Sequence, residues 1–302
     1  MNESTAIPPN ETGFDAVLGF TLPGRDVRGR CVRLGPVLDT ILSAHDYAGP
    51  IRHLLAEALL LATLIGSLGK EEGSQMTMQA QSADGIVDML VCDYRDGELR
   101  GYVRYDADRL ADLGANPSLS ALVGSEAYLA ITFDVADGGR YQGIVPLDAE
   151  SLAGACEAYF RQSEQLPTVI KVAVQSMDGH CVVGGLLLQH LPDGEEGRER
   201  LHVRLDDPDW EHVTILGSTI RHAELADPGL SLEALLWRLF HEEEQLLVET
   251  VAKLERGCRC TPQHYRQVLS RFGAEELAEM RDDDGLIRVD CAFCSRIFPI
   301  DV

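Results

Sequence analysis

Basic residues are scarce in this chain of 302 residues. Lys and Arg together number 26 against 49 Asp and Glu, so the formal net charge is −23. Because a surface with this excess of negative charge repels a phosphate backbone, the composition removes the main driving force for nucleic-acid binding and favours solubility. We therefore expect no nucleic-acid partner.

The sequence also lacks segments of the kind that direct a chain into or across a membrane. Residues 1–13 are polar, without the basic start and apolar run of a secretory signal. The most apolar stretch, residues 58–69, is 12 residues long, whereas a membrane span needs about 20. We expect this stretch to be a buried helix, and the protein to be cytoplasmic with no membrane partner.

A glycine-rich phosphate-binding loop is missing as well, since none follows a predicted strand.

Between residues 15 and 192, helical and strand patterns mix without a regular βαβ alternation, which predicts an α+β domain. Apolar residues recur every three or four positions at 53–69 and 151–162, which predicts two helices. Strands are predicted at 76–82, 87–94, 99–105, 127–133, 141–145, 168–175 and 181–189.

Residues 195–257 differ in composition from the predicted domain before them. They hold 15 acidic and 7 basic residues, which is typical of a charged linker. A helix is predicted at 231–249, with Ser231 as its N-cap and an apolar stripe that another surface must cover. Because three glutamates follow one another at 242–244, we expect this helix to depend on docking. The stripe consists of Leu232, Leu235, Leu236, Leu239, Phe240, Leu246 and Leu247.

Cysteine is the residue type whose spacing indicates chemistry. Four of the eight cysteines form two pairs, Cys258-x-Cys260 and Cys291-x-x-Cys294, separated by 30 residues. Clustered thiols in a chain without an export signal indicate metal or redox chemistry rather than a disulfide framework. Four thiolates suit one tetrahedral Zn²⁺ with no open position, which predicts a closed site rather than a Lewis-acid catalyst. His264 is an alternative ligand, and a purely structural zinc ribbon is an alternative role.

The spacing also favours a switch. A metal ion would join the two ends of the 30-residue loop, whereas disulfides within each pair would leave the ends unjoined. A structural zinc site contributes about 10 to 16 kcal/mol to folding, whereas a hydrophobic core as small as that of residues 258–302 contributes only about 3 to 5 kcal/mol. Loss of the metal is therefore predicted to unfold residues 258–302. The local pairing is a hypothesis, because a bridge from Cys258 to Cys260 would need a bent backbone.

The remaining cysteines are isolated in the sequence, and two of them lie in apolar, strand-like runs. Thiols in such surroundings are usually buried and inert. We expect this of Cys31, Cys92, Cys156 and Cys181.

Four motifs outside the cysteine pairs are distinctive: YQGIVPL at 141–147, YFRQSEQLPT at 159–168, GLLLQHLP at 185–192 and LWRLFHEE at 236–243. Together with the cysteine spacing they resemble the heat-shock protein 33 family of redox-regulated chaperones, and the resemblance extends over nearly the whole chain. It implies three parts: a large α+β N-terminal domain at 1–194, a helical linker at 195–257 and a small zinc-binding C-terminal domain at 258–302.

The resemblance also implies a mechanism. Members of the family are largely inactive when reduced and zinc-bound, and oxidation under unfolding conditions forms disulfides among the four paired cysteines, releases zinc and melts the linker. This implies an ATP-independent holdase that binds unfolding client proteins, as a homodimer when activated. Melting would expose the apolar stripe, which offers a client-binding surface. The client-binding residues would be Leu232, Leu235, Leu236, Leu239 and Phe240.

The chain departs from the family pattern beside the first cysteine pair. Thr261-Pro262 stands where the family often has Ser-Arg, and Arg256-Gly257 where an apolar residue is common. Because such neighbours tune metal affinity and thiol reactivity, the oxidation threshold stays open.

Two other classes of function are weaker candidates. An enzyme needs converging catalytic groups, but His45-Asp46-Tyr47 are adjacent in the sequence, and Ser163 and Glu164 have no identifiable base. We therefore expect no enzymatic activity. A constitutive holdase, or a zinc-ribbon interaction protein without redox switching, is the alternative to the switch.

Overall fold

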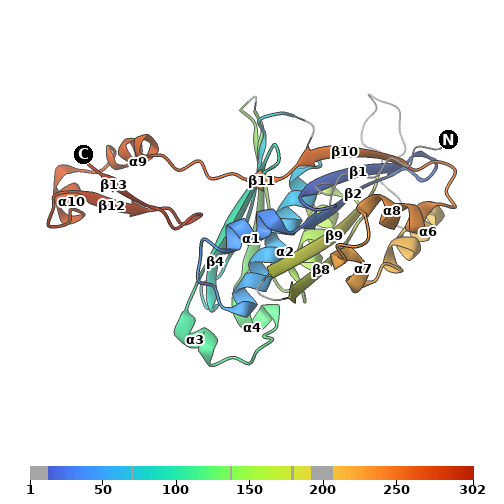
Figure 1. Ribbon diagram of the computed structural model, residues 1–302, viewed down its shortest axis with the longest axis horizontal. Coiled ribbons are helices and arrows are strands. Elements are labelled where there is room, and N and C mark those ends of the chain that lie inside the picture. The colour runs from blue at the N-terminus through green and yellow to red at the C-terminus, as the bar shows by residue number, and fades with distance from the viewer. Residues whose placement is uncertain (1–12, 70, 137, 178–179, 192–206) are drawn as a thin grey trace, which may run out of the picture.

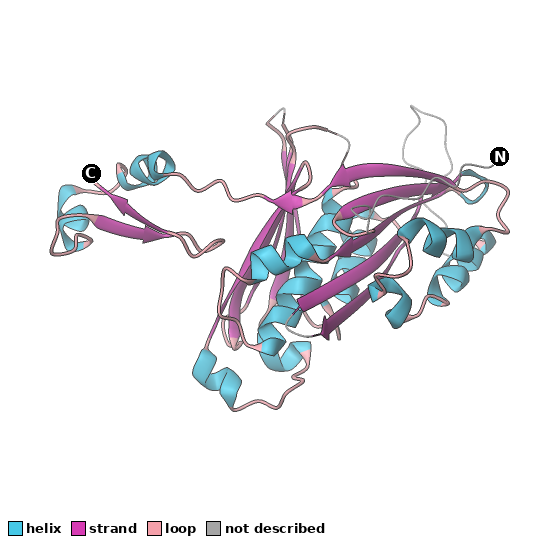
Figure 2. Cartoon of the chain, viewed as in Figure 1, coloured by secondary structure: helices cyan, strands magenta, loops and turns pink. Residues whose placement is uncertain are grey.

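The computed structural model describes residues 13–69, 71–136, 138–177, 180–191 and 207–302. The first twelve residues and the predicted start of the linker at 195 lie outside these ranges. In the described part, the strands form a five-stranded, a six-stranded and a two-stranded sheet (Figures 1 and 2). This mixture of largely antiparallel sheets and separate helices confirms the predicted α+β class.

The five-stranded sheet, sheet A, is antiparallel throughout. It contains two of the predicted strands, β8 (Thr168–Met177) and β9 (His180–His190), together with three strands that the sequence patterns did not predict. Its order is β10 (Leu247–Lys253), β1 (Ala16–Leu22), β2 (Val27–Leu34), β9 (His180–His190) and β8 (Thr168–Met177).

The six-stranded sheet, sheet B, contains the other five predicted strands and the short strand β11. In this sheet β11 (Glu255–Arg256) pairs in parallel with β5 (Glu98–Tyr105), and the other neighbours pair antiparallel. The order is β11 (Glu255–Arg256), β5 (Glu98–Tyr105), β4 (Val87–Arg95), β3 (Gln75–Gln81), β6 (Tyr128–Asp134) and β7 (Arg140–Pro146).

Helix α2 (Gly49–Gly66) lies between the two sheets and forms the centre of the main core (Figure 1). Strands approach it closely from both sides: a Cβ on Gly101 of β5 would lie 3.0 Å from Leu59, and one on Gly185 of β9 would lie 2.7 Å from Leu60. By length and composition α2 could cross a membrane, but 67% of it is buried inside the protein. It is therefore the buried helix that the sequence predicts.

The predicted helix at 151–162 is present as α5 (Leu152–Tyr159), followed by the π turn η2 (Phe160–Glu164). Gln165 ends the turn with a left-handed φ of 58°. The other short helices of this part are η1 (Pro23–Arg25), α1 (Pro36–Leu42), α3 (Ala107–Ala111) and α4 (Leu119–Val123).

Three helices from the predicted linker cover the outer face of sheet A. Successive residues of a strand point to opposite faces, so Leu187 of β9 joins the main core while Leu186 and Leu188 join a second core beneath these helices. Burial on both faces explains the continuous apolar run in β9. The helices are α6 (Pro208–Ser218), α7 (His222–Ala226) and α8 (Leu232–Phe240).

The predicted helix at 231–249 is wrong beyond Phe240. Helix α8 ends there, and Leu247 begins β10, which pairs antiparallel with β1. A strand forms because this segment is rich in β-branched residues and β1 offers it a partner. Leu247 is exposed, whereas five residues of the predicted stripe are buried against sheet A. They are Leu232, Leu235, Leu236, Leu239 and Phe240.

Arg33 of β2 binds this helical layer to sheet A. Its side chain is fully buried, and its guanidinium donates hydrogen bonds to the backbone carbonyl oxygens of Leu225 (2.8 Å), Leu230 (2.7 Å) and Glu224 (3.1 Å). Two of these carbonyl groups lie in the last turn of α7, where a helix has no internal donors for them. One buried arginine therefore satisfies acceptors that would otherwise oppose docking of the layer.

Arg33→Met is expected to lower the free energy of unfolding by about 3 kcal/mol, because one buried and two partly buried carbonyl oxygens lose their donor. Urea denaturation at neutral pH measures the change. Arg104→Met is the matched control, since Arg104 is exposed and pairs with Asp88 at the surface. This substitution is expected to leave the free energy of unfolding nearly unchanged, and equal effects of the two substitutions would contradict the role of Arg33.

Glu243 fixes the chain just after α8. Its carboxylate accepts a hydrogen bond from Nε of Arg25 in η1 (2.8 Å) and lies 2.8 Å from Nε2 of His212 in α6. Burial acts to raise the pKa of Glu243, but the hydrogen bonds and charges of Arg25 and His212 outweigh burial and lower it. The ionised carboxylate therefore stabilises the docked layer.

Because the pKa of Glu243 is lower in the folded state than its ordinary value of 4.5, its contribution to stability is complete above pH 4.5. The contribution is lost as the pH falls through the folded-state pKa. Glu243→Gln is expected to lower the free energy of unfolding by about 1 to 3 kcal/mol at neutral pH. Denaturation at a series of pH values should show this difference shrinking toward acid, and a constant difference would argue against the ion pairs.

Candidate metal centre

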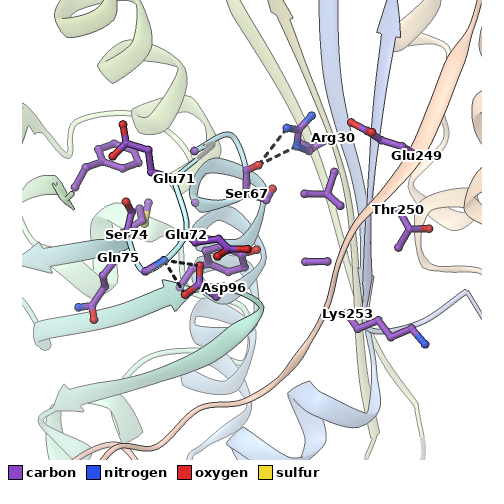
Figure 3. A pocket seen from close by; sticks show the side chains of 18 residues that line it. Arg30, Ser67, Glu71, Glu72, Ser74, Gln75, Asp96, Glu249, Thr250 and Lys253 are labelled. Atoms are coloured by element: carbon purple, nitrogen blue, oxygen red, sulfur yellow. Dashed lines mark hydrogen bonds between the residues drawn. The ribbon is translucent and has the colours of Figure 1, made fainter. Parts of the chain in front are cut away.

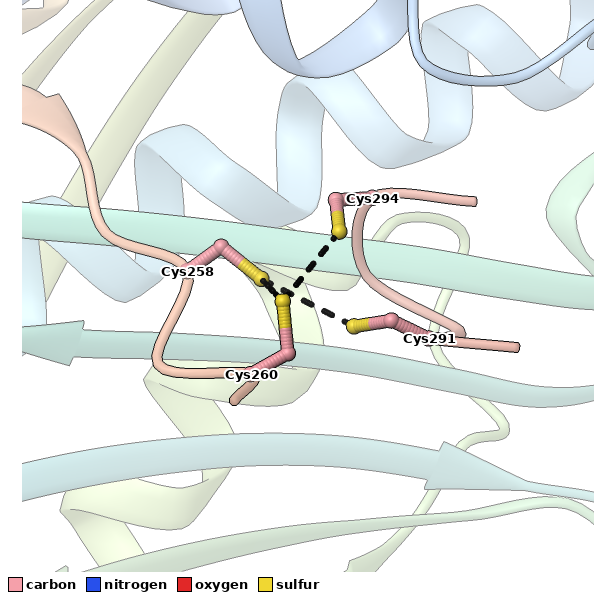
Figure 4. A group of neighbouring side chains, drawn as sticks. All are labelled: Cys258, Cys260, Cys291 and Cys294. Atoms are coloured by element: carbon pink, nitrogen blue, oxygen red, sulfur yellow. Dashed lines mark hydrogen bonds between the residues drawn. The ribbon is translucent and has the colours of Figure 1, made fainter. Parts of the chain in front are cut away.

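The four paired cysteines meet at one point in the C-terminal part of the chain (Figure 4). Cys258 and Cys260 follow β11, and Cys291 and Cys294 lie in the turn between β12 (Ile287–Asp290) and β13 (Ile297–Ile300). Their four Sγ atoms lie within 4.8 Å of one another. The Sγ–Sγ distance is 3.2 Å from Cys258 to Cys260, 3.7 Å from Cys258 to Cys291 and 3.5 Å from Cys260 to Cys294.

These distances fit a tetrahedral metal site. With metal–sulfur bonds of about 2.3 Å, the sulfur atoms at the corners of a tetrahedron lie about 3.8 Å apart. A disulfide would need a sulfur–sulfur distance of about 2.0 Å, and all four cysteines are free thiols. The four residues can therefore hold a metal ion with no open coordination position.

The backbone around the second pair directs its two sulfur atoms to the same side. The amides of Cys294 (3.1 Å) and Ser295 (2.8 Å) both donate to the carbonyl oxygen of Cys291, and the amide of Cys291 donates to the carbonyl oxygen of Arg296 (3.0 Å). Ser295 has a left-handed φ of 53°, which lets the chain reverse into β13. This tight turn brings residues three apart to one metal site.

Thr261-Pro262, where the chain departs from the family pattern, begins helix α9 (Pro262–Leu269). The Thr261 hydroxyl accepts a hydrogen bond from the amide of His264 (3.1 Å), and proline occupies the first helical turn, where it costs no hydrogen bond. His264, the alternative ligand, packs its ring against Tyr265 at 5.6 Å. The group of possible metal ligands consists of the four cysteines without it.

Tyr265 is a neighbour of the centre that nothing in the sequence pattern marked. Burial acts to raise the pKa of Cys291, but hydrogen bonds from the Tyr265 hydroxyl and the Phe293 backbone amide outweigh burial and lower this pKa to about 7. Burial raises the pKa of Cys260 and Cys294. Cys291 is therefore easier to deprotonate than these two thiols.

Few side chains support the centre. The C-terminal part adds α9, α10 (Ala274–Glu279) and the β12–β13 hairpin, which lie to one side of the two large sheets (Figure 1). Two of the paired cysteines belong to its small hydrophobic cluster, so the sulfur atoms are part of its core. The buried members are Leu269, Ile287, Cys291, Cys294, Phe298 and Ile300.

The isolated cysteines Cys31, Cys92, Cys156 and Cys181 are all buried, as predicted. Burial raises the pKa of Cys31 to about 12 and also raises the pKa of the other three thiols. Because the thiolate is the reactive form of cysteine, these four side chains are poor targets for oxidation.

The residues weighed as catalytic candidates have structural contacts instead. His45 stacks on Tyr47 with ring centroids 4.6 Å apart, and the Tyr47 hydroxyl hydrogen-bonds the backbone of Val103. Glu164 accepts hydrogen bonds from the hydroxyl groups of Tyr141 (2.5 Å) and Tyr159 (3.0 Å). These contacts hold loops and the π turn in place.

A cleft of about 1010 Å³ lies between the β10 edge of sheet A and the loop before β3 (Figure 3). Its lining mixes acidic side chains with Arg30, whose guanidinium donates to the carbonyl oxygen of Ser67 at 3.2 and 3.1 Å. The cleft lining contains none of the four paired cysteines. The candidate metal centre is therefore separate from this cleft.

Residues 15–301 match the family model described as Hsp33 protein. The chain belongs to the Hsp33 family. This Hsp33 chain is 39% identical to a 33 kDa chaperonin of Caulobacter vibrioides (strain NA1000 / CB15N), over 98% of both chains. It is 34% identical to a 33 kDa chaperonin of Serratia proteamaculans (strain 568), over 91% of this chain and 88% of the relative.

A solved structure has the same fold. The 33 kDa chaperonin (heat shock protein 33 homolog) from Thermotoga maritima is 20% identical and matches with a TM-score of 0.78, covering 95% of this Hsp33 chain and 94% of the other. The Hsp33 family consists of chaperones and not of enzymes. The chain is therefore a chaperone, and its partners are unfolded client proteins.

Proposed function

We propose that this chain is an ATP-independent holdase controlled by a redox switch, with the four paired cysteines as its sensor. The observation that supports the proposal most is the convergence of four free Sγ atoms within 4.8 Å, in a part of the chain whose hydrophobic cluster is small. Membership of the family accounts for chaperone function, and the sulfur cluster supplies a means of regulating it.

Zn²⁺ is the metal that this all-sulfur donor set favours. Four thiolates at tetrahedral spacing suit zinc, whereas Mg²⁺ and Ca²⁺ prefer oxygen ligands. When bound, zinc stabilises the thiolate form of its ligands at neutral pH, and the thiolate is the form that an oxidant attacks. Cys258, Cys260, Cys291 and Cys294 would hold the ion.

Oxidation by hydrogen peroxide balances within one cysteine pair. Two thiolates lose two electrons and form one S–S bond, while peroxide takes up these electrons and two protons and becomes two water molecules. Two such reactions consume all four metal ligands. The 3.2 Å separation of Cys258 and Cys260 favours local pairing, but the cross-pair distances of 3.5 and 3.7 Å are close to it. Peptide mapping of the oxidised protein decides between them.

Loss of the ligands would remove the link between the ends of the 30-residue loop, so residues 258–302 would unfold. This step would also release the segment before Cys258, which continues back through β11 and β10 toward α8. Undocking of α8 would expose a large apolar surface of the kind that binds non-native chains. The client-binding side chains we propose are Leu232, Leu235, Leu236, Leu239 and Phe240.

The proposal assigns one task to each part of the chain. Residues 1–194 form the chaperone domain, residues 195–257 the linker that undocks, and residues 258–302 the zinc-binding switch.

The cytoplasm suits this mechanism because its reducing conditions keep the thiols free until oxidative stress. The net charge of −23 keeps client complexes soluble and opposes nucleic-acid binding. The activated form is proposed to be a homodimer.

The reduced protein is expected to bind one Zn²⁺ per chain, and its removal by a chelator should unfold the C-terminal part alone. The reason is that zinc binding contributes more free energy than the small hydrophobic cluster. Hydrogen exchange followed by mass spectrometry should show lost protection at 258–302 and retained protection in α2. Unchanged protection at 258–302 after zinc removal would contradict the structural role of the metal.

Peroxide at mildly raised temperature is expected to release zinc and to start suppression of client aggregation without ATP. A chromogenic chelator follows the zinc, and light scattering follows an aggregating client. The reduced protein should suppress little scattering. Suppression that ignores redox state indicates a constitutive holdase, and zinc release without suppression indicates a zinc-ribbon interaction protein.

Cys291→Ser removes one ligand and is expected to abolish stoichiometric zinc binding and the response to peroxide. Cys181→Ser is the matched control, because Cys181 is buried outside the centre and its sulfur lies 3.8 Å from the Ser176 hydroxyl, which gives a serine a polar neighbour. This variant should keep both zinc and the peroxide response. Loss of the response in both variants would show that the four-sulfur centre is not the sensor.

A further inference from the structure

The turn that carries Cys291 and Cys294 also touches sheet B. Phe293 lies between these cysteines and packs edge-on against Tyr102 of β5, with ring centroids 5.0 Å apart and an interplanar angle of 89°. Arg100 of the same strand places its guanidinium carbon 4.1 Å from the centre of the Phe293 ring. Two side chains of the N-terminal domain therefore hold one aromatic ring of the metal centre.

The receiving side chains on sheet B are also held in position by other residues of the sheet. Nε of Arg100 donates to Oδ2 of Asp93 on β4 (2.7 Å), and Asp93 is 3% exposed and also accepts a hydrogen bond from Thr77 on β3 (2.7 Å). The Tyr102 hydroxyl contacts the sulfur of Met89 (3.3 Å). Because the buried carboxylate of Asp93 orients Arg100, this part of the sheet presents a preorganised surface to Phe293.

The first cysteine pair is attached to the same strand. Gly257, next to Cys258, donates its amide to the carbonyl oxygen of Leu99 (3.0 Å), and Arg259 pairs with Glu98 (3.1 Å). This ion pair is partly buried, and Arg259 also donates a hydrogen bond to the side chain of Gln75 on β3. An aromatic pair and a cation–π contact each contribute about two- to tenfold. The aromatic contact of the second pair therefore adds measurably to these polar contacts in attaching the C-terminal part to sheet B.

We propose that Arg100 and Tyr102 form an intramolecular docking site for Phe293, through which the arrangement of the four sulfur atoms controls attachment of the C-terminal domain to sheet B. The link to the sensor rests on the proposed function. A disulfide brings two sulfur atoms to about 2.0 Å, so a bridge between Cys291 and Cys294 reshapes the turn between them. Phe293 then leaves the outer face of β5, and β11 loses a neighbouring support.

Hydrogen exchange of the Gly257 amide in the reduced protein, measured by NMR, tests the docking site. Phe293→Leu and Arg100→Met are each expected to speed this exchange about three- to tenfold, because the detached state is populated more often. Arg104→Met is the matched control, since the side chain of Arg104 lies on the same face of β5 as Arg100 and Tyr102 but pairs with Asp88. Its exchange should match the wild type.

The double variant Phe293→Leu/Arg100→Met should exchange no faster than the faster single variant, because both substitutions remove one shared contact. Equal exchange in Arg100→Met and Arg104→Met, or effects that multiply in the double variant, would overturn the docking site. Zinc content is measured separately for every variant and should stay at one ion per chain, which keeps the test independent of metal loss.

Coupling to the sensor is tested in the wild-type protein. After peroxide treatment and zinc release, Gly257 should exchange at least as fast as in reduced Phe293→Leu. Retained protection of this amide after zinc release would overturn the coupling. Client binding does not enter these measurements, so failure of the proposed holdase switch and failure of the docking site give different results.

Discussion

The convergence of four sulfur atoms is the constraint on which the C-terminal part of this chain depends. Two segments 30 residues apart supply the atoms, and two of the cysteines are also buried members of the only sizeable apolar cluster that the structure describes beyond residue 257. A core of this size is marginal by itself. Folding and sensing would therefore share one interaction, so that chemistry at sulfur becomes a change in structure.

Features that depend on local pattern were predictable from the sequence. Seven strands of the two large sheets and helix α2 follow from hydrophobic periodicity, because the side chains that face a core repeat along each element. The four paired cysteines lie together as their spacing predicted, since short spacings within each pair restrict where the sulfur atoms can point. The burial of the isolated cysteines follows from their apolar surroundings.

Features that depend on remote partners were not predictable. The β1–β2 hairpin contains Arg28, Arg30 and Arg33, a pattern typical of a surface, but these side chains bind groups 37 to 197 residues away. Strand β10 escaped prediction because its pairing with β1 outweighs the helical pattern that precedes it. The contact of Phe293 with Arg100 also joins residues that nothing in the sequence relates.

A short stretch of chain connects all of these features. Residues 247–260 contribute β10 to sheet A, β11 to sheet B and the first two sulfur atoms to the metal centre. Leu254, between the two strands, donates its amide to the carbonyl oxygen of Asp15 (2.7 Å). Because β10 is an edge strand with mostly exposed side chains, its position depends largely on backbone pairing. Loss of the sulfur ligands at Cys258 would therefore affect the edge of sheet A, and with it the chain that leads from α8, through this stretch rather than through the main core.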